Sequence, residues 1–321
     1  MDSALIFQLL KKFLADSNNF LLILGKIPTN MIKRINILVF ALLAALTAQG
    51  QIFYKITGNG LAKPSYLFGT HHLAPLSVAD SLGVEGIIAS VDMVVGEIDM
   101  TQDKMAMAMQ MQPHMVAPAD STLSKVFGKE KMDLYSPIFS KYAPMSGMTL
   151  NMLDPMKPMV VNAMVMMGMI QKMMPNFKEG DQLDTYFQQI AQKRGRIIVP
   201  LETAEQQAII LYDSTPIAEQ AESLSEIFEN PEEAMENARI LNNAYAKGDL
   251  DAMYKLSKSE DVNPEFFDKL LFKRNAEWMK KLPSIINKGS AFIGVGALHL
   301  AGEKGLIEEL RKLGYTVTPV K

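Results

Sequence analysis

The stretch SYLFGTHH, residues 65–72, decides the fold of this chain. It begins as a short apolar strand and ends in two adjacent histidines, His71 and His72. A second β-rich run, IFYKITG at 52–58, precedes it, and the Gly-rich residues 58–60 between the two runs signal a turn. We therefore predict a β-hairpin whose second strand carries both histidines to its end.

Three later apolar runs end in a similar way, each followed closely by a residue with a chemically useful side chain. The runs are 93–96 before Glu97, 196–201 before Glu202, and 291–296 before His299. Short apolar runs of this length are typical of buried strands. Because ligands bind at the carboxyl ends of the strands in α/β sheets, we expect these three residues to converge with His72.

The rest of the chain alternates between helical patterns and short strands. We expect helices at about 80–90, 204–212, 217–228, 231–246, 264–282 and 302–313, and a last strand at 316–320. Pro231 and Pro264 stand where a first helical turn tolerates proline, and Pro319 favours a sheet edge. The pattern predicts an α/β (α+β) fold, with a mixed β-sheet flanked by helices.

Most of the 24 methionines lie between Met93 and Met174, in a stretch punctuated by prolines. We predict that residues from about 100 to 195 form a Met-rich helical subdomain inserted after the first strands. The methionines have two interpretations. They would either fill the core of the inserted helices, or line a soft-metal site or an adaptable apolar groove for a peptide or lipid.

The composition excludes several classes of site. The 321 residues contain no cysteine, so a disulfide, a cysteine nucleophile and a cysteine-ligated zinc are ruled out. The formal net charge is −3 and no block of Lys and Arg forms a phosphate-binding stripe, so we expect no nucleic acid partner. Any metal site must therefore use carboxylates and the four histidines.

The N-terminal region has the pattern of a secretory targeting sequence. A basic pair precedes an apolar run at 35–45, and small residues stand before a cleavage position after Gly50. We expect 31–50 to be a signal peptide, 1–30 an upstream extension, and 51–321 the exported domain. The alternative is an uncleaved membrane anchor, which the short run disfavours because a spanning helix needs about 20 residues. Export would place the domain in the periplasm or cell envelope, in proximity to a membrane.

The strand-end residues suit the chemistry of a metal-dependent hydrolase. Two imidazoles and a carboxylate, from His72, His299 and Glu97, are a common ligand set for a divalent metal that keeps positions open for water. Glu202 would act as a general base, and Arg274 would stabilise charge on the substrate oxygen. Glu97 has a second interpretation, because a buried arginine would equally satisfy a carboxylate at the end of an apolar strand.

Five segments in order resemble the TraB/GumN family and together span residues 53–320. They are YLFGTHH at 66–72, VVGE at 94–97, LETAEQ at 201–206, the Arg-Asn pair at 274–275, and VGALHLAGEKG at 295–305. His71 departs from the family pattern, which often has an apolar residue at this position. Strand geometry turns its side chain away from that of His72, so we expect it to pack or to support the site.

The resemblance implies both a fold and a reaction. The family is similar to the erythromycin-esterase and ChaN-like group, which has a mixed sheet flanked by helices. Its animal Tiki members are metal-dependent proteases, so the resemblance implies a metalloprotease-like hydrolase with a peptide or protein substrate and manganese, cobalt or zinc as cofactor. Two alternatives stay open: a non-catalytic binding protein for haem, peptide or lipid, and a metal-independent, esterase-like hydrolase.

Overall fold

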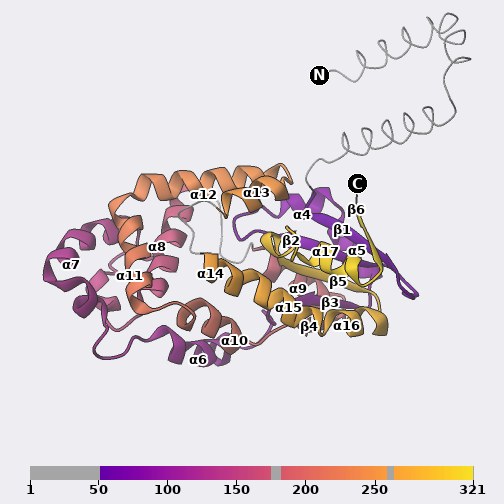
Figure 1. The fold of residues 1–321 in the computed structure, drawn as a ribbon, viewed down its shortest axis with the longest axis horizontal. Helices are drawn as coiled ribbons and strands as arrows, with labels where there is room; N and C mark the ends of the chain where they lie inside the picture. Colours follow the sequence, from indigo (N-terminus) through magenta and orange to yellow (C-terminus); the bar gives the residue numbers. More distant parts are fainter. Residues whose placement is uncertain (1–50, 175–181, 259–263, 321) are drawn as a thin grey trace, which may run out of the picture. The chain divides into compact units, whose positions relative to one another are not determined.

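The computed structural model describes residues 51–174, 182–258 and 264–320. Within these residues six strands form one sheet, in the order β4-β3-β5-β2-β1-β6 (Figure 1). The strands are β1 (Phe53–Gly58), β2 (Ser65–Thr70), β3 (Met93–Gly96), β4 (Ile197–Pro200), β5 (Ala291–Gly296) and β6 (Tyr315–Pro319). The expected α/β fold with a mixed sheet is confirmed.

The strands that precede the predicted site residues all run in one direction. Strand β5 lies between β2 and β3 and is parallel to both, and β3 is parallel to β4. Strand β1 pairs antiparallel with β2, with Phe53 opposite Phe68, so the predicted hairpin is confirmed. Strand β6 pairs only with β1, so Pro319 lies in an edge strand as expected. The carboxyl ends of β2, β3, β4 and β5 therefore meet at one edge of the sheet.

Helices surround the strands and make up most of the chain between β3 and β5 (Figure 1). Those before β4 are α4 (Ser77–Ser81), α5 (Val84–Ser90), α6 (Lys104–Met115), α7 (Leu123–Tyr142), η2 (Leu150–Leu153), α8 (Pro158–Met173) and α9 (Leu183–Lys193). Those after β4 are α10 (Ala204–Ala208), η4 (Ile209–Asp213), α11 (Ile217–Glu229), α12 (Pro231–Ala246), α13 (Leu250–Leu256), α14 (Pro264–Phe267), η5 (Asp268–Lys273), α15 (Arg274–Met279), α16 (Leu282–Lys288), η6 (Ala297–His299) and α17 (Leu306–Lys312). The helices expected at 217–228 and 231–246 are confirmed as α11 and α12.

Aromatic side chains pack helix α9 against the sheet in the larger core. Phe68 and Phe292 lie on the neighbouring strands β2 and β5, and Phe187 of α9 contacts both edge-on, with ring centroids 5.1 and 4.9 Å away. All three rings are buried, and each edge-to-face contact adds about 0.5–1.5 kcal/mol to the gain from burial. This packing fixes α9 so that its first turn reaches the end of β2, where Thr70 hydrogen-bonds Asp184.

A second core lies among α7, η2, α8 and α11, at the end of the folded unit away from the strands (Figure 1). Tyr135 and Phe228 pack there with ring centroids 4.9 Å apart, and the buried Met132 and Met169 fill space between the helices. For these two methionines the gap-filling interpretation is supported. Helix α11 belongs to the second core although it follows β4 and lies outside the predicted insertion at 100–195. Helix α9 lies within that predicted insertion but packs on the sheet.

Two of the expected helices are interrupted by π-helical turns. The helix expected at 204–212 is α10 followed by the π-helical η4, and the helix expected at 264–282 contains the π-helical η5 between α14 and α15. Thr203 caps α10 by accepting a hydrogen bond from the backbone of Gln206, in a capping box. A π-helical turn shifts the side chains that follow it, and such turns are frequent at functional sites. The hydrophobic period of the sequence does not reveal them.

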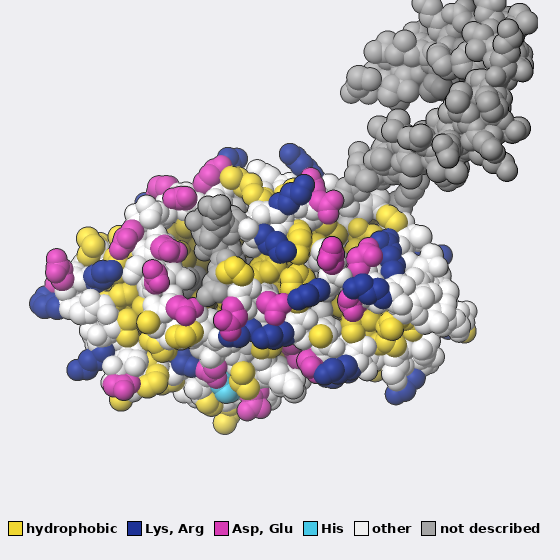
Figure 2. Space-filling view, viewed as in Figure 1, with side chains coloured by type: hydrophobic (Ala, Val, Ile, Leu, Met, Phe, Trp, Pro, Cys, Tyr) yellow, Lys and Arg dark blue, Asp and Glu magenta, His cyan; other side chains and the backbone are white. Residues whose placement is uncertain are grey.

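Two further features concern the surface and the helices of the described residues. Acidic and basic side chains are intermixed on the face drawn in Figure 2, which carries no gathered basic stripe. Within the described residues, no helix is both long enough and apolar enough to cross a bilayer. The signal peptide predicted at 31–50 and the extension predicted at 1–30 lie outside the described residues and stay predictions.

Gly168 of α8 provides a test of the packing between α7 and α8. A Cβ atom at this position would lie 1.7 Å from the backbone oxygen of Tyr142, far inside van der Waals contact. We expect Gly168→Ala to lower the free energy of unfolding, measured by urea denaturation, by at least about 2 kcal/mol. Gly86→Ala in α5 is the matched control, because no atom lies within 4 Å of the added methyl group and alanine favours a helix. An unchanged unfolding midpoint for Gly168→Ala would contradict this packing.

Candidate active site

A cavity of about 360 Å³ lies at the carboxyl ends of the parallel strands. Its lining includes His72, Glu97, Arg274 and His299, all of which the sequence predicted as site residues. Glu202, the remaining predicted residue, is buried and hydrogen-bonded to Arg274. The π-helical segments η4 and η5 supply part of the apolar wall. The fold thus brings all the predicted site residues to one place.

Arg274, the first residue of α15, joins the charged residues of the site. Its Nη2 donates to Glu97 Oε2 and, at 2.6 Å, to Glu202 Oε1, while its Nε donates to Glu202 Oε2 at 3.1 Å. Its Nη1 donates to His299 Nε2 at 3.0 Å and to the carbonyl oxygen of Leu270 at 3.1 Å. A single guanidinium therefore links both carboxylates to the histidine that follows β5.

Trp278 supports this network from one helical turn further along α15. The guanidinium carbon of Arg274 lies 4.7 Å from the centroid of the indole ring, a cation–π contact in a buried setting. The indole Nε1 donates to Glu202 Oε2 at 3.2 Å, and the ring stacks on His299 with centroids 4.3 Å apart. The i, i+4 spacing of Arg274 and Trp278 places both side chains on the same face of the helix.

Glu202 has both carboxylate oxygens engaged. Arg274 and Trp278 donate to Oε2, while Arg274 and Gln207 donate to Oε1, the latter at 3.2 Å. The sequence suggested Glu202 as a general base. Saturation by these donors favours a different role, in which its carboxylate anchors the guanidinium of Arg274.

Glu97 stays ionised although it is largely buried. Burial alone would raise its pKa, but Arg274, His299 and the backbone N–H of Gly296, which donates to Oε1 at 2.8 Å, bring it down to about 2. Burial would lower the pKa of Arg274, and the charges of Glu97 and Glu202 more than offset this, so that it is raised. The pairing of Glu97 with a buried arginine, one of its two interpretations from the sequence, is therefore observed.

The hydrogen bonds of Asn275 establish which ring nitrogen of His299 carries the proton. The side-chain Nδ2 of Asn275 donates to the backbone oxygens of His299 and Lys304, at 3.0 and 2.9 Å. Its Oδ1 is then the acceptor that faces His299 Nδ1 at 2.7 Å, so Nδ1 is protonated. Burial lowers the pKa of His299 to about 3, with Arg274 adding to this effect and Glu97 opposing it. His299 is therefore neutral and directs its Nε2 lone pair at Arg274.

His72 also lines the cavity, and its surroundings differ from those of His299. Its side chain is 74% exposed, and its Nδ1 is 3.7 Å from Oδ2 of Asp184, a residue in the first turn of α9. Thr70 donates to the other oxygen, Oδ1, at 2.8 Å. Burial raises the pKa of Asp184 and the charge of Glu97 adds to this, while His72 opposes it. Sequence reasoning missed Asp184, because an acid in the first turn of a helix is commonplace.

The other two histidines have structural surroundings. His71 packs on Tyr245 with ring centroids 5.1 Å apart, and burial and the neighbouring His72 lower its pKa to about 4. Its Nε2 is buried without a hydrogen-bond partner in the part of the chain that the structure describes. His114 in α6 lies outside the cavity, where its Nδ1 is 2.5 Å from Asp213 Oδ2 and Lys157 binds the other oxygen.

A metal with three protein ligands does not fit the site as these side chains are placed. Arg274 already binds Glu97 Oε2 and the Nε2 lone pair of His299, two atoms that a metal would otherwise use. Glu97 Oε1 and His299 Nε2 are 3.9 Å apart, and among the described residues no three His, Asp or Glu side chains gather as a metal-binding group. Binding by His72, Glu97 and His299 would require Arg274 to leave His299, and the metal stays a prediction.

A larger, mainly apolar cavity of about 830 Å³ adjoins the active-site cavity and shares His71, His72 and Leu241 with it. We call it the apolar groove. Its remaining apolar lining includes Leu73, Met166, Met167, Ile170, Ile227 and Ile240. Met166 and Met167 belong to the Met-rich stretch, so these two methionines line a groove, as the second interpretation of that stretch proposed.

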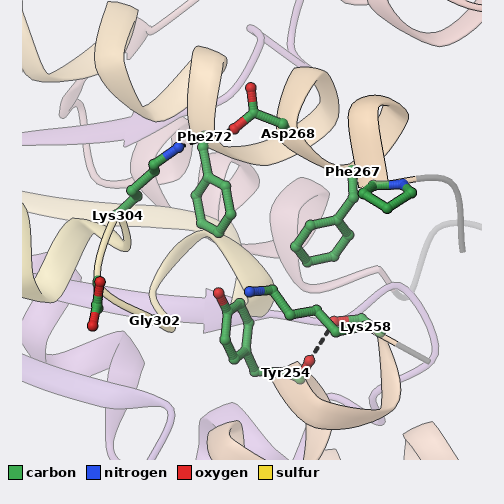
Figure 3. A pocket seen from close by; sticks show the side chains of 10 residues that line it. Tyr254, Lys258, Phe267, Asp268, Phe272, Gly302 and Lys304 are labelled. Atoms are coloured by element: carbon green, nitrogen blue, oxygen red, sulfur yellow. Dashed lines mark hydrogen bonds and ion pairs between the residues drawn. The ribbon is translucent and has the colours of Figure 1, made fainter. Parts of the chain in front are cut away.

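A third cavity, of about 780 Å³, lies beside η5 but shares no lining residue with the active-site cavity (Figure 3). Tyr254, Phe267 and Phe272 line it, and the three ring centroids are 5.7–6.4 Å apart. Lys304 at its margin pairs with Asp268 at 3.2 Å. These contacts pack η5 against α13, and none of the predicted site residues lines this cavity.

The pKa of His71 predicts how stability depends on pH. Because this pKa is lowered from 6.5 to about 4 on folding, the unfolded chain binds a proton between these values that the folded chain does not. Stability therefore falls as the pH drops through this window, by up to about 1.4 kcal/mol per pH unit. His71→Phe keeps a ring against Tyr245 and removes this proton. Urea denaturation measures the free energy of unfolding of both proteins. On going from about pH 7 to about pH 4.5 the wild type should lose about 2 kcal/mol more than His71→Phe. Equal losses in the two proteins would refute the lowered pKa of His71.

Removal of the Arg274 charge tests the central network. Arg274→Met leaves the buried carboxylates of Glu97 and Glu202 without their counter-ion, so we expect a loss of about 3–5 kcal/mol in the free energy of unfolding at neutral pH. Arg239→Met is the control, because Arg239 forms an exposed pair with Glu236 and such pairs contribute about 0–1 kcal/mol. Equal stability of the two variants would show that Arg274 does not hold the site together.

Comparison with known proteins bears on the resemblance seen in the sequence. Comparisons with curated proteins and with solved structures give no significant match to the chain. The profile of one family does match, over residues 52–319, which include all the described strands and the active-site cavity. Because this match covers nearly the whole folded part of the chain, the protein belongs to the TraB/PrgY/gumN family.

Proposed function

We propose that this protein is a hydrolase that cleaves peptide bonds in a peptide or protein substrate. The observation that carries the proposal is the convergence of His72, Glu97, Arg274 and His299 on one cavity at the carboxyl ends of parallel strands. A concave site with a few convergent polar groups and perturbed pKa values is the usual setting of an active site. The family resemblance supports hydrolysis as the reaction.

The apolar groove supports a peptide as the substrate. The groove and the active-site cavity share His72. An apolar side chain of a substrate peptide bound in the groove would therefore place the peptide backbone near the polar residues of the cavity. Methionine side chains adapt to ligands of differing shape, which suits a substrate with several permitted side chains. Release of apolar surface from water would supply the binding energy, and the polar cavity would supply the orientation.

The family resemblance supports a metal-dependent form of this hydrolase. Manganese, cobalt or zinc would be held by His72, Glu97 and His299, and would supply hydroxide at neutral pH. Because Arg274 engages Glu97 and His299, this form requires Arg274 to change its contacts when the metal binds.

The Arg274 network favours a second form, which is metal-independent. His72 is exposed to the cavity and is not engaged by Arg274, so its imidazole is available to accept a proton from water. Arg274 places a positive charge at the cavity wall, where it would stabilise the negative charge that develops on the substrate carbonyl oxygen. Glu97, Glu202 and His299 would then hold the guanidinium in place.

The predicted signal peptide at 31–50 supports a location in the periplasm or cell envelope. In that compartment the substrate would be an exported peptide or an envelope protein. The absence of cysteine is compatible with an oxidising compartment, because no thiol is present to form an unwanted disulfide.

We expect the full chain to hydrolyse members of a fluorescence-quenched peptide library rich in apolar residues. His72→Ala should lower kcat/KM by at least about 100-fold, because it removes either a metal ligand or the general base. His114→Ala is the matched control, since His114 lies outside the cavity. Elemental analysis of the same proteins, with and without chelator, then separates the two forms.

Each result of this experiment has a distinct meaning. One divalent ion per chain, lost in the His72→Ala/His299→Ala variant together with activity, would support the metal-dependent form. Activity that persists in chelator but is lost in His72→Ala would support the metal-independent form. Absence of hydrolysis with every metal tested would refute the proposal, and a Soret band on addition of haem would then favour a binding protein.

A further inference from the structure

We propose that Asp184 is a positioning residue, which accepts a hydrogen bond from Nδ1 of His72 and so turns the Nε2 lone pair of His72 toward the cavity. The role of the Nε2 lone pair in the reaction rests on the proposed function. The hydrogen bond itself is a property of the resting protein and can be tested without substrate.

The two oxygens of Asp184 have different surroundings. Oδ1 accepts a hydrogen bond from Thr70 at 2.8 Å. Oδ2 is buried and has no hydrogen-bond partner within the described part of the chain, and the nearest cationic or imidazole nitrogen is His72 Nδ1, at 3.7 Å. A buried carboxylate oxygen without a donor is destabilising, because it has lost its hydrogen bonds to water. This destabilisation disappears if His72 donates to it.

A small movement of the exposed His72 side chain would bring it within hydrogen-bond distance of Asp184. An N–H···O hydrogen bond needs a separation of about 3 Å, so the imidazole must move by about 0.7 Å from its 3.7 Å position. The His72 side chain is 74% exposed and is therefore free to make this movement. The carboxylate is the fixed partner and the imidazole is the adjustable one.

The carboxylate of Asp184 is held firmly by the elements around it. Phe187, almost one helical turn further along α9, is buried against the aromatic rings of the sheet. Gln188 donates to the carbonyl oxygen of Ile98 at 2.9 Å and accepts from the backbone N–H of Met100 at 2.8 Å, which fastens α9 to the segment after β3. Helix α9 is thus tied to the strands whose ends form the cavity.

An ordinary helix-terminal role does not account for this geometry. An acid in the first turn of a helix is stabilised by the helix dipole, and this explains why α9 tolerates Asp184. It does not explain why one oxygen is buried, unpaired and turned toward the only exposed imidazole of the cavity. A solvated helix-terminal acid would point both oxygens to water.

The arrangement at Asp184 would repeat the one observed at His299. There the side-chain oxygen of Asn275 accepts from Nδ1 at 2.7 Å and leaves the Nε2 lone pair to accept from Arg274. With Asp184 as the acceptor for His72, both of these cavity-lining imidazoles would carry the proton on Nδ1 and keep a lone pair on Nε2. A carboxylate on Nδ1 orients a metal-binding imidazole as well as a catalytic base, so the inference holds for both forms of the hydrolase.

The test is the tautomer of His72, read by NMR from the two-bond couplings of the ring in the full chain labelled with ¹⁵N-histidine. We expect the neutral form of His72 to carry its proton on Nδ1. His72→Gln assigns the signal. Asp184→Leu removes the acceptor, keeps the branching of the side chain and should abolish the preference for Nδ1. Asp184→Ala is the second variant, in case leucine disturbs folding.

Asp213→Leu is the matched control, since it removes the same kind of carboxylate from Nδ1 of another histidine, His114. It should change the His114 signal and leave that of His72 unaltered. An Nε2-protonated or averaged His72 in the wild type, or a His72 signal that Asp184→Leu leaves unchanged, would overturn the proposal.

Kinetics give a second readout if hydrolysis is found. Asp184→Leu should lower kcat by about 10- to 100-fold, as expected for a residue that orients a catalytic imidazole, while KM changes by less than about twofold. A loss confined to KM would contradict positioning. If the protein proves not to hydrolyse peptides, the proposed function fails while the NMR result still decides whether Asp184 sets the tautomer of His72.

Discussion

The guanidinium of Arg274 is the interaction on which the rest of the site depends. Two carboxylates and an imidazole from the ends of three strands would repel one another or lose solvation if they were buried together without a cation. Arg274 hydrogen-bonds all three, and Trp278 covers it on one side. The strand ends can therefore approach closely, and the sheet edge becomes a cavity with a fixed charge in its wall.

The residues bound by Arg274 and the imidazole of His72 have unlike surroundings. Around Arg274 the donors and acceptors of Glu202 and His299 are paired and buried, so the charges and tautomers there are set before any ligand arrives. At His72 the imidazole is exposed, and a buried oxygen of Asp184 lacks a partner in the described part of the chain. Preorganised charge together with an adjustable imidazole suits a site in which charge develops during the reaction.

Much of the site could be predicted because strand direction and strand ends leave a clear trace in the sequence. Apolar runs followed by Glu97, Glu202 and His299 indicated strands, and parallel pairing then required their carboxyl ends to meet. Arg274 was identified through its resemblance to a family motif, and the possibility of an arginine partner for Glu97 followed from the cost of an unpaired buried charge.

The sequence by itself determined the mixed sheet, the hairpin and the residues that gather at the sheet edge, because hydrophobic runs and turn residues act over a few positions. Only the tertiary structure decided that Arg274 fills the space between these residues, that Glu202 anchors it, and that Asp184 faces His72. These contacts join residues far apart in the chain and depend on the π-helical turn before Arg274 and on the packing of α9. Side-chain directions of this kind follow from packing in three dimensions, which no local pattern encodes.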